Sequence, residues 1–285
     1  VEVPFIPLAT LDAARIGALN NMVKIPGGTF VMGTSEIEKA QLKKLGITPG
    51  DDEIPHKVTI TGFELAATEV TQEMFEAVIG YNPATFKGAK RPVEQVNWFE
   101  ANEYCLRLSY LFSKLTPEQK AKLEAWAETA KKGRDSAEYQ AAMIEYAKYA
   151  QGQKGLYQLP TEAQWEYAAR GGKQFIYGTV DGTLSSENAA VPHYIADVGS
   201  KKPNPFGLYD MNGSVWEWNA DWYGELAADD VKDPVGANAG QLRVLRGGSS
   251  GVDYGDVCRS ADRSSRSDPD YCYNYVGFRP ARTLQ

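Results

Sequence analysis

The sequence has little of several residue types on which common functions depend. Its 285 residues include two histidines, His56 and His193, and three cysteines. Two histidines are too few for a histidine-rich zinc site and disfavour a Ser/His/Asp triad, and three cysteines are too few for a disulfide scaffold. The net charge of -7 lacks the basic field that nucleic acid binding needs, and no apolar run is long enough to span a bilayer. We therefore expect no nucleic acid partner and no membrane-spanning segment.

The chain does have enough apolar content for one large folded domain. Hydrophobic residues make up 43% of it, which permits a sizeable core. Residues 1–21 lack a strong period and are expected to form an N-terminal arm, followed by a single domain over residues 22–285. Between about residues 113 and 155 the composition shifts to Ala, Lys, Glu and Tyr, which predicts two amphipathic helices. We interpret this segment as a helical insertion, either a partner surface or a packed insertion with a solvated charged face.

Capping motifs predict where several helices begin. Asn97 with Glu100, and Thr161 with Gln164, have the spacing of a capping box. In a capping box the side chain of each residue accepts a hydrogen bond from the backbone N–H of the other. Cys105 recurs with apolar neighbours at helical spacing and is expected in the core. The insertion helices are expected to start at caps as well, namely Thr116 for the first and Asp135 or Ser136 for the second.

Seven motifs follow one another in a characteristic order: IPGGTFVMG, EVT, PVEQVNWFEANEYC, LPTEAQWEYAARGG, NPFGLYDMNGSVWEW, RVLRGGS and GFRPAR. In this order they resemble the formylglycine-generating-enzyme-type, or sulfatase-modifying, domains, which are a branch of the C-type lectin fold. The resemblance covers about residues 22–283 apart from the insertion. It implies an α+β, C-type lectin-like fold, rich in coil, with a small antiparallel sheet and peripheral helices. Because one scaffold can carry unlike activities, function needs a separate argument.

The resemblance also implies where an enzyme of this family would keep its chemistry. In such enzymes two cysteines follow the RGGS motif and bind copper, a metal that thiolates favour. Here the corresponding positions fall approximately at Val252 and at Asp256 or Val257, which cannot hold copper. We therefore predict no catalytic residue. The alternative is a copper or thiol oxidase of the formylglycine-generating type whose cysteines have moved to Cys258 and Cys272.

The same resemblance implies a calcium site in the loop YDMNGSVWEW. Calcium prefers oxygen ligands, and the family pattern carries over to the side chains of Asp210 and Glu217 and the carbonyl groups of Gly213 and Val215. In the alternative interpretation the two carboxylates brace the neighbouring tryptophans through hydrogen bonds. No cofactor is expected to be required, and calcium is the one that the resemblance suggests.

The stretch SSGVDYGDVCRSADRSSRSDPDYCYNY, Ser249 to Tyr275, lacks five amino acids altogether. Lys, Glu, Gln, Met and Trp account for 18, 21, 12, 5 and 6 residues of the chain, so about six of the 27 would be expected to belong to this set. A turn-rich loop favours Ser, Gly, Asp and Asn. The absent residues share a further property, however, because every one of their codons ends in a purine. Codons with a fixed pyrimidine in the third place can never encode them.

This absence is the result expected when Asn codons, AAC or AAT, are mutated at their adenines. The stretch thus resembles the variable region of proteins that diversity-generating retroelements alter, many of which use the C-type lectin fold, treponemal variable proteins included. The resemblance implies a surface lipoprotein, extracellular or at the cell surface, which is lipid-anchored in its full-length precursor. The chain itself contains no lipobox.

Fixed and variable positions can be separated in and around this predicted variable region, residues 249–275. The expected fixed positions supply strand, turn and core anchors: Arg246, Gly247, Gly248, Arg259, Ala261, Arg263, Pro269, Gly277, Phe278 and Arg279. Variable side chains are expected to be exposed, because a core tolerates few such changes. The predicted ligand-binding positions are Ser250, Gly251, Val252, Asp253, Tyr254, Asp256, Val257, Asp262, Ser264, Ser265, Arg266, Ser267, Asp270, Tyr271, Cys272, Tyr273, Asn274 and Tyr275.

These positions together resemble an antibody binding surface. Tyrosines supply rigid amphipathic area, Ser and Gly adapt, and Asp and Arg add charge selectivity. The sequence therefore predicts a non-enzymatic, receptor-like or adhesin-like protein whose partner is a protein or other macromolecule outside the cell. The alternatives are the oxidase above, an accessory domain that presents the helical insertion to a partner, and a solvated loop without a binding role.

Overall fold

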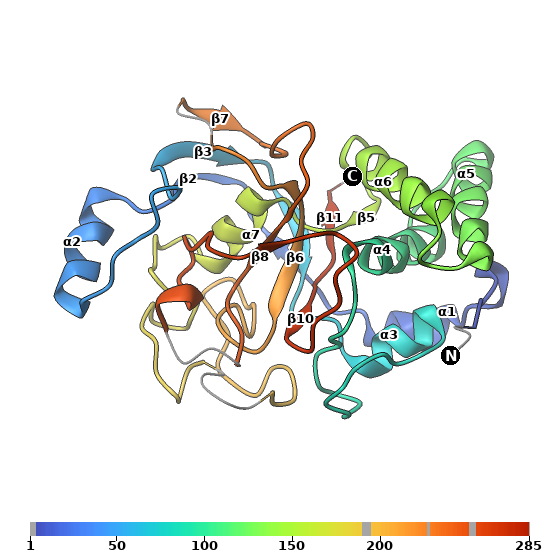
Figure 1. Cartoon of the computed structure of the whole chain (residues 1–285), viewed down its shortest axis with the longest axis horizontal. Helices are drawn as coiled ribbons and strands as arrows, with labels where there is room; N and C mark the ends of the chain where they lie inside the picture. Colours follow the sequence, from blue (N-terminus) through green and yellow to red (C-terminus); the bar gives the residue numbers. More distant parts are fainter. Residues whose placement is uncertain (1–3, 190–194, 227–228, 251–254, 285) are drawn as a thin grey trace.

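The computed structural model describes residues 4–189, 195–226, 229–250 and 255–284. It contains three small β-sheets, two at the centre of the view and a third along its upper edge (Figure 1). The first sheet has the order β1 (Met22–Ile25), β4 (Phe63–Ala66), β11 (Ala281–Thr283) and β5 (Tyr157–Gln158). The second has the order β10 (Val276–Gly277), β6 (Trp216–Trp222), β8 (Arg243–Arg246) and β9 (Arg266–Ser267). The third has the order β2 (Gly28–Met32), β3 (His56–Ile60) and β7 (Val231–Lys232).

The strands pair mainly in the antiparallel sense that the sequence predicts. Two pairs differ, because β10 runs parallel to β6 and β7 runs parallel to β3. Parallel neighbours need long connections, and both pairs join strands that are far apart in the chain. The α+β class is as predicted, with one short antiparallel sheet and two short mixed sheets in place of a single antiparallel sheet.

The predicted capping motifs are present at the helices that cover the sheets. Helix α4 (Trp98–Phe112) begins with a reciprocal capping box between Asn97 and Glu100, and α7 (Glu162–Ala169) begins with one between Thr161 and Gln164. Each box satisfies N–H groups that the first turn of a helix leaves without partners. The side chain of Cys105 on α4 is fully buried, as expected.

Several helices lie outside these two. Helix α3 (Gln72–Ile79) packs against α4 and ends at Gly80, whose φ of 100° suits glycine. The predicted N-terminal arm contains a short 3₁₀ turn, η1 (Leu8–Thr10), and a helix, α1 (Ala13–Leu19), which the sequence did not predict. Helix α2 (Glu36–Leu45), also unpredicted, lies at the far end of the molecule from the other helices (Figure 1).

The helical insertion consists of α5 (Pro117–Glu128), the 3₁₀ turn η2 (Thr129–Lys132) and α6 (Ala137–Gln151). As predicted, Thr116 caps the first helix; Ser136 and not Asp135 caps the second. Both helices pack against α4, where the hydroxyl groups of Ser109 and Tyr146 lie 2.9 Å apart. The insertion is therefore part of the packed core on one side of the sheets (Figure 1).

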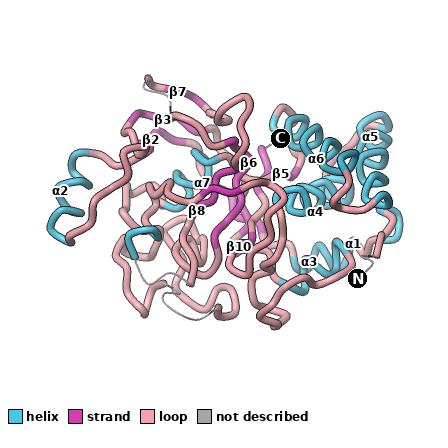
Figure 2. Tube along the Cα trace, in the orientation of Figure 1, coloured by secondary structure: helices cyan, strands magenta, loops and turns pink. Residues whose placement is uncertain are grey.

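The C-terminal half consists mostly of coil, as Figure 2 shows for the long connections between α7 and β6 and after β8. Its one short helical element beyond β8 in the described residues is the 3₁₀ turn η3 (Gly255–Cys258). Among the described residues, no helix is long and apolar enough to cross a membrane.

Candidate functional site

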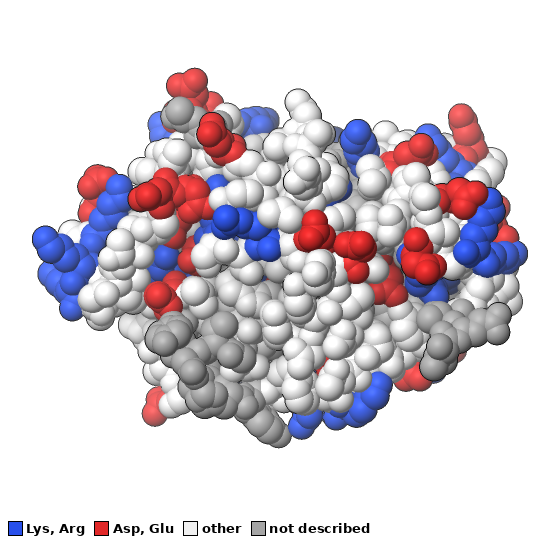
Figure 3. Space-filling view, viewed as in Figure 1, with Lys and Arg blue, Asp and Glu red and all other residues white. Residues whose placement is uncertain are grey.

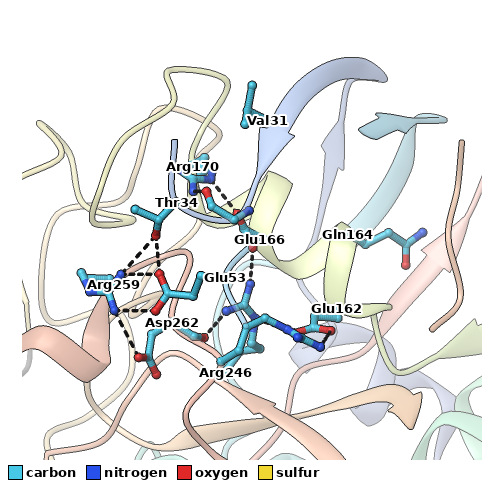
Figure 4. A network of polar contacts seen from close by, with 12 residues as sticks. Val31, Thr34, Glu53, Glu162, Gln164, Glu166, Arg170, Arg246, Arg259 and Asp262 are labelled. Atoms are coloured by element: carbon cyan, nitrogen blue, oxygen red, sulfur yellow. Dashed lines mark hydrogen bonds and ion pairs between the residues drawn. The ribbon is translucent and has the colours of Figure 1, made fainter. Parts of the chain in front are cut away.

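Buried arginines anchor the coil of the predicted variable region to distant parts of the fold. Arg259 donates from both terminal nitrogens to the Glu53 carboxylate, each at 2.7 Å, and Arg263 holds Glu162 at 2.7 and 3.0 Å. Burial alone would raise the pKa of Glu53, but the hydrogen bonds and charge of Arg259 outweigh it and leave that pKa lowered. Figure 4 shows how this network draws together strands, helix α7 and coil.

The remaining expected fixed positions are also buried or tightly placed. Arg246 pairs with Glu166, and the guanidinium of Arg279 holds both oxygens of Glu217 at 2.7 and 2.8 Å. A side chain at Gly248 would lie 2.4 Å from Cys258 Sγ, and its φ is 75°. Ala261 and Phe278 are 3% and 0% exposed, and the carbonyl of Pro269 accepts from Trp98 N–H. We refer to the anchoring arginines and their partners as the arginine frame: Arg246, Arg259, Arg263, Arg279, Glu53, Glu162, Glu166 and Glu217.

Three tyrosines just before β10 form a stack on the surface. The rings of Tyr271 and Tyr273 lie 5.1 Å apart at 9°, and those of Tyr273 and Tyr275 lie 5.2 Å apart at 16°. Alternate residues of an extended segment point to one side, which explains this tyrosine stack. Tyr271 and Tyr275 are 49% and 38% exposed.

Main-chain contacts hold this segment in place. Gln95 N–H donates to the Tyr273 carbonyl at 2.9 Å, and Trp216 N–H donates to the Tyr275 carbonyl at 2.8 Å. Because these bonds use the backbone, they place the chain without the exposed rings of Tyr271 and Tyr275, whereas Tyr273 is half-buried and packs against the core. β10 lies near the lower centre of the view (Figure 1), where Figure 3 shows few charged side chains; Lys, Arg, Asp and Glu gather over α2 and over the insertion.

Residues that alternate with the tyrosines line a cleft against the helical insertion. Asp270 and Cys272 form one wall, and Lys132 and Arg134, in the turn between α5 and α6, form the other. The cleft has a volume of about 1090 Å³. Arg134 is held by Glu103 on α4 at 2.8 Å. The insertion thus faces the predicted variable region, a juxtaposition for which the sequence carries no signal.

The expectation that every variable side chain is exposed is wrong at three positions. Ser250, Asp262 and Ser267 are only 4%, 5% and 8% exposed. Asp262 lies between Arg259 and Ser264, whose hydroxyl donates to it at 2.7 Å, and burial raises its pKa to about 6. We therefore add Asp262 to the arginine frame.

The other predicted positions divide as follows. Ser264, Arg266, Asp270, Tyr271, Cys272 and Tyr275 are exposed, while Asp256, Val257, Ser265, Tyr273 and Asn274 are half-buried. Gly251, Val252, Asp253 and Tyr254 lie outside the described residues.

The cysteines are not arranged as a metal or dithiol site. All three are free thiols; Cys258 is buried beside Gly248, whereas Cys272 lies in the cleft. Burial raises the pKa of the Cys258 thiol to about 12, with Asp262 adding to the effect. Cys272 is exposed, and its partial enclosure in the cleft followed by the charge of Glu100 raises its pKa as well. A thiol with a raised pKa is a poor nucleophile near neutral pH.

The predicted calcium loop contains a partly satisfied group of carboxylates. Asp210 accepts from Gly199 N–H at 2.6 Å, and Glu217 is occupied by Arg279 and by Trp165 Nε1–H at 2.9 Å. Glu69 is buried, neither of its carboxylate oxygens has a hydrogen bond, and burial followed by the charge of Asp210 raises its pKa well above the usual range. Glu69 has a loose ion pair, with its Oε2 4.0 Å from Arg279 Nη2, which leaves both oxygens able to bind a further cation. Sequence reasoning did not predict this residue.

The same group also has features that count against calcium. Among the described residues, no cluster of three His, Cys, Asp or Glu side chains has metal-binding spacing. Calcium would therefore rely on Asp210 and on the carbonyl groups of Gly213 and Val215, because the arginine frame already uses Glu217.

Three comparisons place this arrangement among known proteins. The chain is 34% identical over 188 residues to the chaperone protein LppX of Paenibacillus barcinonensis, a match that covers 58% of this chain and 64% of that protein. It is 27% identical over 325 residues to the mouse formylglycine-generating enzyme, covering 93% and 75%. The structure of Treponema denticola variable protein 1 superposes with a TM-score of 0.69 at 27% identity, covering 92% and 94%. The chain thus spans less than two thirds of the LppX protein.

The family itself is defined by a match over nearly the whole chain. The model of the sulfatase-modifying factor enzyme 1-like domain matches residues 9–284. This range includes both the arginine frame and the tyrosine stack. The chain belongs to the family of sulfatase-modifying factor enzyme 1-like domains, with their variant of the C-type lectin fold.

Proposed function

We propose that this chain is a non-enzymatic ligand-binding protein, and that the tyrosine stack and its exposed neighbours form a replaceable binding face. The observation that carries the proposal is the division within one short segment. Buried Arg259, Asp262 and Arg263 hold the coil, while the rings of Tyr271 and Tyr275 are exposed. A face of this kind can change its side chains without loss of the fold.

The chemistry of this face suits a macromolecular ligand. Tyrosines offer large, rigid contact area with a hydroxyl at the edge, and they lose little conformational entropy on binding. The exposed Ser264, Arg266 and Asp270 belong to the same stretch of the sequence and offer polar groups. We propose a protein or another macromolecule as the ligand, with diversification by retroelement adenine mutagenesis. The similarity to a treponemal variable protein supports this proposal.

The setting of the protein follows from the same resemblance. We propose that it acts outside the cell or at the cell surface, lipid-anchored in its precursor. If calcium is bound at the Asp210 loop, we propose that it neutralises the carboxylates near Glu69. Its role would then be to stabilise the fold and not to take part in a reaction.

The alternative function is an oxidase of the formylglycine-generating type. The similarity to the mouse enzyme favours it, whereas the separation of Cys258 from Cys272 and their raised pKa values weigh against it. Copper titration together with turnover of a Cys-X-Pro-X-Arg peptide distinguishes the two. Tight copper binding that Cys258→Ser abolishes, with product formed, would replace our proposal.

Two display libraries test the binding face directly. The first randomises Tyr271, Tyr273 and Tyr275 with codons that end in a pyrimidine, and the second randomises Arg259 and Asp262 in the same way. We expect most members of the first library to resist protease and some to bind immobilised streptavidin, used as an arbitrary protein target. Most members of the second library should be degraded. Equal protease sensitivity of the two libraries would contradict the proposal.

A further inference from the structure

Arg243 on β8 is held in an unusual position for a charged side chain. It is 4% exposed, and its guanidinium carbon lies 3.7 Å from the ring centroid of Trp98 and 3.3 Å from that of Trp222. The two rings cover both faces of the planar group through cation–π contacts. Only the edge of the guanidinium, with its N–H donors, remains to meet a partner.

Most of those donors lack an acceptor. Nη1 donates to the carbonyl of Ala220 at 2.7 Å. Nε is buried and has no hydrogen-bond acceptor, and no described residue accepts a hydrogen bond from Nη2. Arg263 and Arg279 hold the carboxylates of Glu162 and Glu217 with this same pair of nitrogens, Nε and Nη2. Because Nε has no contact with solvent and Nη1 is used by Ala220, Nη2 is the nitrogen of Arg243 that can donate a charge-assisted hydrogen bond to a small anion.

Arg243 also differs from the other buried arginines in its ion pairing. In the described part of the chain, the other buried arginines each form an ion pair with a carboxylate: Arg107, Arg170, Arg246, Arg259, Arg263 and Arg279. No such pair is present at Arg243. The carboxylate whose charge acts on the pKa of Arg243 is Asp221. The pKa of Asp221 is itself raised to about 7 by burial and by the charge of Glu162. Burial therefore lowers the pKa of Arg243, to about 9, and at neutral pH it stays a buried cation.

A small cavity lies beside this cation. Its volume is about 180 Å³, and it is lined by Arg243, by Lys148 and Gln151 of α6, and by Asn238. Lys148 is exposed, so a second positive charge stands where the cavity meets solvent. A water molecule has a share of about 30 Å³ in the liquid, so there is room for a small anion with its hydration. The amide groups of Gln151 and Asn238 supply further donors.

We propose that Arg243 and this cavity bind a small oxyanion, a carboxylate group in particular. Arg243 would supply the buried charge and Lys148 the attraction at the entrance. Phosphate offers the same oxyanion chemistry but carries more charge than one buried cation balances, which is why we assign a carboxylate. The site lies between β8 and the helical insertion, and no residue that lines it belongs to the predicted variable region.

The test titrates the full chain with sodium acetate, and separately with sodium phosphate, against sodium chloride at constant ionic strength. The readouts are the side-chain Nε–H resonances of arginine and the intrinsic tryptophan fluorescence, since Trp98 and Trp222 flank the site. We expect a saturable change with acetate that moves one arginine resonance. Lys148→Glu should weaken acetate binding about fivefold through charge reversal near the site. Lys44→Glu, at an exposed position on α2, makes the same change in net charge and should leave binding unchanged.

Arg243→Gln should abolish the saturable change, and Lys148→Glu keeps the test decisive if the Arg243 variant does not fold. Absence of saturation with either anion, or equal weakening by the Lys148 and Lys44 variants, would overturn the proposal. Saturation with phosphate alone would overturn the carboxylate assignment.

Discussion

Removing the Arg259 side chain is the sharpest perturbation of the arginine frame. Glu53 and Asp262 are 3% and 5% exposed, and Arg259 contacts both, at 2.7 and 3.4 Å. Arg259→Gln would leave both carboxylates buried without a cation. Breaking a buried pair in this way costs about 3–5 kcal/mol. At about 2–4 °C per kcal/mol for a large domain, the melting temperature should fall by roughly 6–20 °C.

Two control variants make this prediction specific. Tyr275→Ser alters the exposed stack and should cost at most about 1 kcal/mol, since a ring pair contributes about that much. The double variant Arg259→Gln with Glu53→Gln removes the orphaned charge and should recover part of the loss. Urea unfolding and thermal denaturation measure all three. Equal destabilisation by Arg259→Gln and Tyr275→Ser would refute the division into frame and face.

The pH dependence gives an independent measure of the same pair. In the native chain Arg259 holds the pKa of Glu53 below its usual range. Its contribution to stability is therefore present above the unfolded pKa and is lost as the pH falls through the folded one. In Arg259→Gln the buried Glu53 binds its proton more tightly in the folded state, so this part of the slope should reverse and stability should rise on acidification.

Three further outcomes follow from other buried groups. Burial raises the pKa of Asp221 to about 7, so its contribution to stability falls as the pH rises from about 4 to 7. Asp221→Asn should remove this pH dependence. In thermal denaturation at pH 8 the variant should be about 1–3 kcal/mol more stable than the native chain. If calcium binds at the Asp210 loop, adding it after chelation should raise the melting temperature, because a ligand at 100 times its Kd stabilises the folded state by about 2.7 kcal/mol. Asp210→Ala should abolish this rise. Gly248→Ala would place Cβ 2.4 Å from Cys258 Sγ. It should lower the free energy of unfolding more than Gly46→Ala, where φ is a similar 72° but no atom lies within 4 Å. Equal urea midpoints for the two variants would contradict the packing described.

Local signals explain how much of the fold could be predicted. The capping boxes at Asn97 and Thr161 predicted α4 and α7 because the signal lies within four residues of chain. Ser35 and Glu38 form the same kind of box at α2, but this helix is mostly polar and Leu42 is its one buried apolar residue, so the apolar pattern that marks α4 and α7 is weak there. Motif order predicted the family, since it depends on many residues at once.

The site was only partly predictable, because burial depends on residues far apart in the chain. Asp262 has the composition of a surface loop residue, yet Arg259 and Glu53, over 200 positions apart, enclose it. Likewise the cleft exists because the insertion turn near Arg134 packs opposite Asp270. Glu69 lacks any local pattern that would indicate a buried carboxylate without hydrogen bonds.

Comparison of the gene with a nearby template repeat tests the central claim most directly. If the exposed face is diversified by adenine mutagenesis, the codons of Ser264 and Arg266 should end in C or T. All codons for the Asp, Tyr, Cys and Asn residues from Asp270 to Tyr275 end in C or T in any case, so those positions are tested by the template alone. A near-identical repeat beside a reverse-transcriptase gene should carry AAC or AAT at those codons. The codons of Arg259, Asp262 and Arg263 should be the same in both copies. Codons ending in A or G on the exposed face, or differences concentrated in the buried frame, would contradict the account.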